Sequence, residues 1–195
     1  LSDSERYVYP KYPNCDRGRC GWAPCADDAN FVKLLIDHFK DNYKIRNVYM
    51  IGNSSGGTFV NSYVCKYPES ITSAISINGM SRLGFGCTPN QPVNFITYAS
   101  LNDTSVPPIG GISADGLFYE TQESLIKTWV DKFECKEKVS KTYKHFETFN
   151  ENLFSECLGG IKIVSILNLD SDHMWPEAGY DKETGLSSYT NYGTC

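Results

Sequence analysis

The sequence predicts an α/β fold: a mostly parallel sheet covered by helices on both faces. Short apolar runs that suit strands alternate with longer segments whose apolar residues recur at helical spacing. This alternation is typical of parallel sheets, because parallel strands need a long crossover connection, which is usually a helix. The 195 residues contain no internal repeat or long linker, so we expect a single domain over residues 1–195.

Two kinds of spacing define the expected elements. Short, mostly apolar runs predict strands over residues 5–9, 47–51, 71–77, 93–98 and 161–167, and the run at 47–51 is of the buried kind. Apolar residues three and four apart predict helices over residues 27–43, 59–67 and 125–135. The first helix opens on Asp27 and Asp28, where the helix dipole favours negative charge, and the second stops at Pro68.

Composition narrows the class of protein. The chain has 18 Lys and Arg against 23 Asp and Glu, a formal net charge of −5, and no basic stripe that would suit nucleic acid or an anionic membrane. An apolar fraction of 41% with 21% charged residues is ordinary for a folded chain. No apolar run approaches the roughly 18 residues of a membrane-spanning helix. We expect a folded protein that does not bind nucleic acid and that has no membrane-spanning helix.

Cysteine is in excess, and its even count suits disulfides, which persist outside the cytosol. The eight cysteines are Cys15, Cys20, Cys25, Cys65, Cys87, Cys135, Cys157 and Cys195. The alternative is a metal site at the first three, but their spacing lacks a Cys-x2-Cys pair and no histidine is near. We therefore expect a secreted protein without a metal. Because the chain opens on Leu1 and retains no signal-peptide core, we expect a processed, trimmed or partial chain.

One motif suggests nucleophilic catalysis. Gly52-Asn53-Ser54-Ser55-Gly56 lies between a predicted strand and a predicted helix, as a nucleophile elbow does. Such an elbow exposes the Ser54 hydroxyl on a tight turn, and we expect both glycines to be needed because a side chain would clash there. The N–H of Ser55 is then placed to stabilise an oxyanion. The alternative is a glycine-rich turn without chemistry.

A serine nucleophile requires a base, and there are three histidines. His38 falls on the flank of a predicted helix, and His145 lies in a polar stretch without evident constraint. His173 follows the strand 161–167 and a short turn, so it lies at the carboxyl end of a strand, where sites form in α/β sheets. His173 is the base by elimination.

An acid is needed to orient the imidazole, and the order Ser, Asp, His places it between residues 54 and 173. Asp103 lies in a loop after the strand 93–98. Asp170 and Asp172 are alternatives, but both are too close in sequence to His173 to support its ring comfortably. A turn aspartate that satisfies its own loop is the other interpretation of Asp103.

These motifs together resemble the polyhydroxybutyrate depolymerase and feruloyl esterase family of α/β-hydrolases. That family has a G-x-S-x-G-G elbow, a D-x-x-V-P loop and an H-x-W-P loop, which match residues 52–57, 103–107 and 173–176. The resemblance covers roughly residues 26–180. It implies an α/β-hydrolase fold without a cofactor, Ser54 as nucleophile, Asp103 as orienting acid and His173 as base. It also implies a disulfide between Cys135 and Cys157.

The sequence departs from this family in three places. Asp172 stands where the family has Gly, so an extra carboxylate adjoins the base. Only about two strands precede the elbow, where several are expected, and the second oxyanion donor comes from that region. A final helix after His173 is not evident. We therefore expect that the chain is an incomplete stretch of a larger hydrolase. The alternative is a reduced or two-chain form, in which a missing segment or a second chain completes the fold.

The expected function is that of a secreted serine esterase that acts through an acyl-enzyme. The expected substrate is a polyester, a feruloyl ester or an acetyl ester of a polysaccharide. Such a substrate is either a polymer or linked to a carbohydrate. Trp175 would stack on a sugar or aromatic acid, or alternatively pack the histidine loop. The sequons at Asn53 and Asn102 overlap the motifs, so we expect them to be unoccupied. The alternative is an inactive hydrolase-fold protein with an extracellular binding or structural role.

Overall fold

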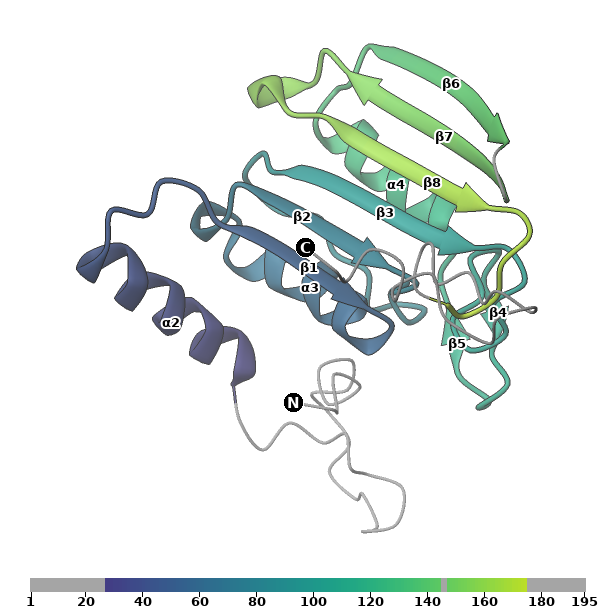
Figure 1. Cartoon of the computed structure of the whole chain (residues 1–195), viewed down its shortest axis with the longest axis horizontal. Helices are drawn as coiled ribbons and strands as arrows, with labels where there is room; N and C mark the ends of the chain where they lie inside the picture. The colour runs from purple at the N-terminus through teal and green to yellow at the C-terminus, as the bar shows by residue number, and fades with distance from the viewer. Residues whose placement is uncertain (1–26, 145–146, 175–195) are drawn as a thin grey trace, which may run out of the picture.

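The computed structural model describes residues 27–144 and 147–174, which form a six-stranded sheet in the order β1-β2-β3-β8-β7-β6 (Figure 1). Its strands are β1 (Tyr49–Asn53), β2 (Ser73–Ile77), β3 (Asn94–Ser100), β6 (Glu137–Lys144), β7 (Thr148–Ser155) and β8 (Ile163–Asn168). β1, β2, β3 and β8 run parallel, whereas β7 and β6 continue the sheet as an antiparallel hairpin. A small second sheet pairs β4 (Gly111–Ile112) with β5 (Phe118–Tyr119).

The helices are α2 (Asp28–Asn42), α3 (Ser55–Lys66) and α4 (Gln122–Lys132), with short 3-10 turns η1 (Pro68–Ser70) and η2 (Leu158–Gly160). The Asp27 side chain caps the first helix by accepting a hydrogen bond from the Asn30 N–H. The prediction of a mostly parallel sheet with intervening helices is confirmed. The predicted strand 5–9 lies outside the described residues. Nowhere in 27–144 or 147–174 is a helix both long and apolar enough to cross a membrane.

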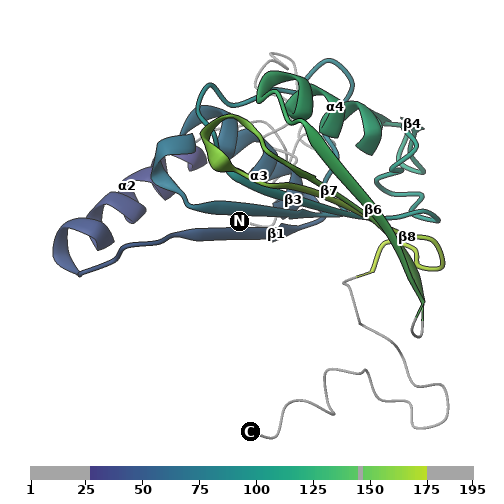
Figure 2. The same cartoon turned by 90° about the horizontal axis from the view of Figure 1, so that it is seen from above.

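The helices that pack on the sheet lie on the same face of it (Figure 2). Ser76 Oγ donates to Gly57 O of α3, and the Phe95 ring stacks on Trp129 of α4 with centroids 4.2 Å apart. Ala74 pairs with Phe95 and lies two residues from Ser76, so these side chains leave the sheet on one side. Among the described residues, α3 and α4 therefore cover one face of the sheet.

The strand β1 is also more exposed than its apolar sequence predicts. Tyr49 and Ile51 are 68% and 55% exposed, because β1 pairs only with β2 among the described strands and no described helix covers that face. On α2, the apolar residues Phe31 and Leu34 are exposed as well. Apolar periodicity predicted these elements correctly, but it did not indicate which apolar residues the described chain covers.

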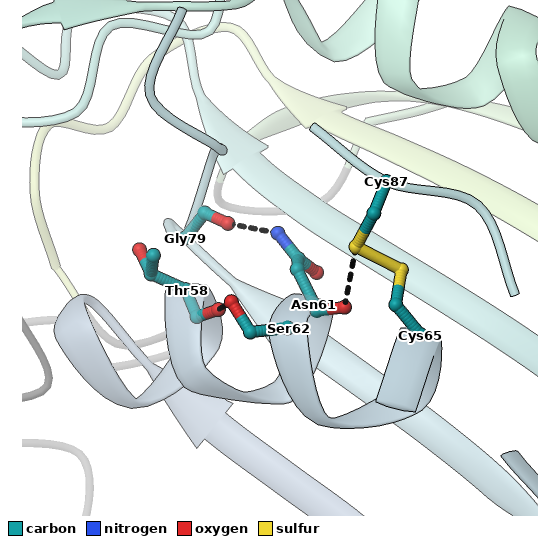
Figure 3. The surroundings of a disulfide bond; sticks show 6 residues. All are labelled: Thr58, Asn61, Ser62, Cys65, Gly79 and Cys87. Atoms are coloured by element: carbon teal, nitrogen blue, oxygen red, sulfur yellow. Dashed lines mark hydrogen bonds between the residues drawn. A yellow bond between two sulfur atoms is a disulfide. The ribbon is translucent and has the colours of Figure 1, made fainter. Parts of the chain in front are cut away.

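The described residues form two disulfides. Cys135 and Cys157 are bridged, as the resemblance implies. The second bridge joins Cys65, near the end of α3, to Cys87 in the loop that follows β2 (Figure 3). The sequence did not indicate this second pairing. The Cys135–Cys157 bridge packs against the hydrophobic core, whose largest fully buried apolar side chains are Trp129, Tyr63, Phe95 and Met80.

Candidate active site

Three parallel strands bring the predicted site residues to one edge of the sheet. Ser54 follows β1, Asp103 follows β3 and His173 follows β8. Because these strands are parallel members of one sheet, their carboxyl ends meet at the same edge. Residues that are 119 apart in sequence thereby come within hydrogen-bond distance.

Ser54 occupies a strained turn. Its φ of 55° and ψ of −122° are rare for a residue with a side chain, and its N–H donates to Ile77 O at 2.8 Å. A Cβ on Gly52 would lie 2.2 Å from Gly56 O, so position 52 requires glycine. Gly56 was expected to be equally constrained, and that expectation is wrong, because a Cβ there meets nothing within 4 Å. Gly57 is the crowded position instead, since its Cβ would lie 2.7 Å from Ile77 O.

Asp103, His173 and Ser54 form a hydrogen-bonded chain. Asp103 Oδ2 accepts from His173 Nδ1 at 2.6 Å, and His173 Nε2 accepts from Ser54 Oγ at 2.8 Å. The other Asp103 oxygen accepts from the N–H groups of Ser105 and Val106, both at 2.8 Å. The Asp103 side chain is fully buried, while that of His173 is 28% exposed. The acid is thus fixed by its own loop, and the imidazole remains accessible from outside.

The electrostatics of the site act on His173. The hydrogen bond to Asp103 raises the pKa of His173 above its usual value, against the lowering effect of burial. The charges of Asp103 and Asp172 raise that pKa further. The arrangement therefore stabilises a proton on the imidazole, as is required of a base that must hold a proton during a reaction.

The N–H of Ser55 lies at the start of α3, directly after Ser54. Amides in the first turn of a helix have no partner within the helix, and the helix dipole makes this end positive. A backbone donor beside the serine can therefore take a developing negative charge.

Asp170 and His38, two of the alternatives, take no part in the hydrogen-bonded chain from Asp103 to Ser54. Asp170 accepts from the Thr148 N–H at 2.6 Å, and His38 is exposed on α2. His145, Trp175 and the cysteines at 15, 20 and 25 lie outside the described residues. Within residues 27–144 and 147–174, no group of three or more His, Cys, Asp or Glu side chains is placed to hold a metal.

Asn168, which no sequence motif above includes, shapes the loop that carries His173. Its buried Oδ1 accepts from the N–H groups of Asp170 and Ser171, and its Nδ2 donates to Tyr98 Oη and to Glu147 Oε2. Asparagine forms such turns readily. An asparagine at the end of the strand before the histidine was the signal that could have indicated this role.

Comparisons with known proteins agree with this architecture. Residues 10–103 match the model of a family described as having the alpha/beta hydrolase fold. An acetyl xylan esterase from Aspergillus awamori has 16% identity and a TM-score of 0.53, over 76% of this chain and 63% of that one. A thermostable esterase has 19% identity and a TM-score of 0.41, over 55% of this chain and 26% of that one. No curated protein matches the chain.

This chain thus spans less than two thirds of either esterase. At these identities the likeness concerns the fold, and the acetyl xylan esterase is the structure that carries it. The parallel strands, the turn at Ser54 that enters α3, and the matched family model agree with one another. The chain has the α/β-hydrolase fold.

Proposed function

We propose that this protein is a serine hydrolase that cleaves carboxylic esters through an acyl-enzyme. The observation that carries the proposal is the hydrogen-bonded chain from Asp103 Oδ2 through the His173 ring to Ser54 Oγ, with bonds of 2.6 and 2.8 Å. Packing alone does not require a strained serine, an accessible imidazole and a buried carboxylate in series. Nucleophilic catalysis requires all three.

In this mechanism His173 removes the proton of Ser54 as the hydroxyl oxygen attacks the ester carbonyl carbon. Asp103 accepts the Nδ1–H throughout and stabilises the imidazolium that forms. The carbonyl oxygen becomes an oxyanion, and the Ser55 N–H donates to it. His173 then gives its proton to the leaving alcohol. Water, deprotonated by the same imidazole, attacks the acyl carbon. The bond from that carbon to Ser54 Oγ then breaks, and His173 returns the proton to Ser54 as the acid is released.

The choice of esters over amides rests on similarity and not on geometry. It is supported by the resemblance to polyhydroxybutyrate depolymerases and feruloyl esterases and by the likeness to an acetyl xylan esterase. We propose a polyester, feruloyl or acetyl ester as substrate, and we propose Trp175, two residues after the base in the sequence, as a binding residue. The disulfides Cys65–Cys87 and Cys135–Cys157 support an extracellular location, because such bonds persist in oxidising compartments.

We further propose that a second oxyanion donor comes from outside the described residues. The exposed apolar side of β1 supports this proposal, because β1 is the strand that leads into the Ser54 turn. On that side, the side chains of Tyr49 and Ile51 are more than half exposed. A chain segment on that side would bury them and lie next to the turn. This segment could belong to the same chain or to another chain, and it would complete the site by providing the second oxyanion donor.

The proposal is tested by ester hydrolysis. The full chain should hydrolyse p-nitrophenyl acetate, and Ser54→Ala should lose the activity by at least about a thousandfold, which is the scale of a lost nucleophile. Thr128→Ala is the matched control, because this hydroxyl lies on the exposed side of α4 and donates only to Ser124 O. Equal activity in the wild type and Ser54→Ala would reject the proposal.

A further inference from the structure

Asn78, just past β2, contacts the segment that carries His173. Its Nδ2 donates to the carbonyl of Met174, the residue directly after His173, at 2.7 Å. Asn78 is only 1% exposed and has a φ of 44°, a left-handed conformation that asparagine tolerates better than most residues. Its own N–H donates to Tyr98 O at 2.8 Å. A buried side chain thus joins the end of β2 to the histidine loop.

The main chain beside Asn78 is fixed to α3. The carbonyl of Gly79 accepts from Asn61 Nδ2, which points out of α3 toward it (Figure 3), and from Ser76 Oγ. A Cβ on Gly79 would lie 2.4 Å from the Cα of Gly57, so the two backbones are in contact. Because the same helix begins at the Ser54 turn, Asn78 is held by the element that positions the serine.

The residue before Asn78 contacts the serine itself. Ile77 O accepts the Ser54 N–H at 2.8 Å. Two adjacent residues, Ile77 and Asn78, therefore bind Ser54 on one side and the histidine loop on the other. The backbone of Ile77 and Asn78, together with the Asn78 side chain, thus links Ser54 to the loop that carries His173.

The histidine loop is anchored differently on its other side. Before His173, Ser171 O accepts from the Asn102 N–H at 3.1 Å, next to Asp103, and Asn168 holds the Ser171 N–H. After His173, the bond from Asn78 to Met174 O is the anchor among the described residues. Among the described residues, loss of that bond would leave the main chain of the histidine loop anchored to other elements only before His173.

We propose that Asn78 is a positioning residue, which keeps His173 within reach of both Ser54 and Asp103 by anchoring the Met174 carbonyl. This inference rests on the proposed function, since it concerns the same reaction. Catalytic geometry is sensitive to such support, because a shift of about 1 Å can cost on the order of a hundredfold in rate. Asn78 need not touch the substrate to act in this way.

Asn78→Gly tests the side chain with little disturbance of the backbone. Glycine adopts a φ of 44° freely. Asn78 Oδ1 makes no hydrogen bond among the described residues, so the substitution breaks the bond to Met174 O without orphaning a second partner. The matched control is Glu134→Gly, because Glu134 is also at a positive φ, of 47°, but is exposed in the turn after α4.

In the full chain, Asn78→Gly should lower kcat by roughly ten- to a hundredfold with KM changed less than about threefold. The pH at which kcat/KM rises should also fall, because a looser contact with Asp103 raises the pKa of His173 less. Glu134→Gly should match the wild type in kcat and in pH profile. If Asn78→Gly does not fold, Asn78→Ala also removes the donor without adding a charge to this buried position, and it should show the same loss of kcat.

Three outcomes are distinct. A folded Asn78→Gly with wild-type kcat and pH profile would overturn this inference and leave the proposed function intact. A kcat loss in Glu134→Gly equal to that in Asn78→Gly would also overturn it, since the effect would then not come from the anchor. A wild-type chain no more active than Ser54→Ala would overturn the proposed function, and the inference with it.

Discussion

The backbones of Gly57 and Gly79 are in direct contact: a Cβ on Gly79 would lie 2.4 Å from the Cα of Gly57. Gly57 is in the first turn of α3, and Gly79 follows β2. Neither residue has a left-handed φ, so closeness and not conformation requires glycine at these positions. This contact sets how near the first turn of α3, which holds Ser55, approaches the end of β2.

Substitution at this contact should be costly, whereas substitution at the nearby Gly56 should not. Gly79→Ala should lower the free energy of unfolding by roughly 1–3 kcal/mol or more, because backbone atoms must move apart. Gly56→Ala should change it by less than about 1 kcal/mol, since its Cβ points into open space and alanine favours helices. Urea unfolding measures both. A tolerated Gly79→Ala would show that the two backbones are not in contact in solution.

The two disulfides should stabilise the fold by similar amounts. Each joins cysteines 22 residues apart, so the loss of chain entropy in the unfolded state predicts about 3 kcal/mol for both. The double variants Cys65→Ala/Cys87→Ala and Cys135→Ala/Cys157→Ala should therefore unfold at similar denaturant concentrations. A large difference between them would mean that one bridge acts through the folded state, by strain or by packing, and would contradict the entropic account.

Removal of the charge at Asp172 should shift the pH dependence of activity. The charge of Asp172 contributes to the raised pKa of His173, so the imidazole stays protonated to a higher pH. Because the base must be neutral, kcat/KM should rise with pH as this group loses its proton. Asp172→Asn should move that rise to lower pH, and the conservative variant Asp172→Glu should move it less. A shift to higher pH in Asp172→Asn would contradict the electrostatic role.

Local patterns predicted the parallel core of the fold well. The runs that became β2, β3 and β8 and the spacing behind α2, α3 and α4 all gave the right element type. The hairpin β6–β7 was missed, because strands such as Glu137–Lys144 are exposed throughout and have few apolar residues. The exposure of the apolar side chains of β1 was also missed. An apolar run predicts a strand, but it does not indicate whether a neighbouring element covers that strand.

The residues of the candidate site were predictable from their types and from their positions at the ends of predicted strands. Ser54, Asp103 and His173 were each expected at the carboxyl end of a strand, and the structure brings them within hydrogen-bond distance. Their catalytic roles remain predictions. Asn78 was not foreseen, because its contact with Met174 joins segments that are far apart in the sequence. Asn168 was overlooked although it makes local turn contacts with Asp170 and Ser171.

The central claim is that Ser54 is an activated nucleophile, and covalent labelling tests it most directly. The full chain is treated with a fluorophosphonate and examined by intact mass and by peptide mapping. One adduct on Ser54, absent in Ser54→Ala and formed at least about a hundredfold more slowly in His173→Ala, is the predicted result. A folded chain that forms no adduct, or one that is labelled equally in Ser54→Ala, would contradict the account.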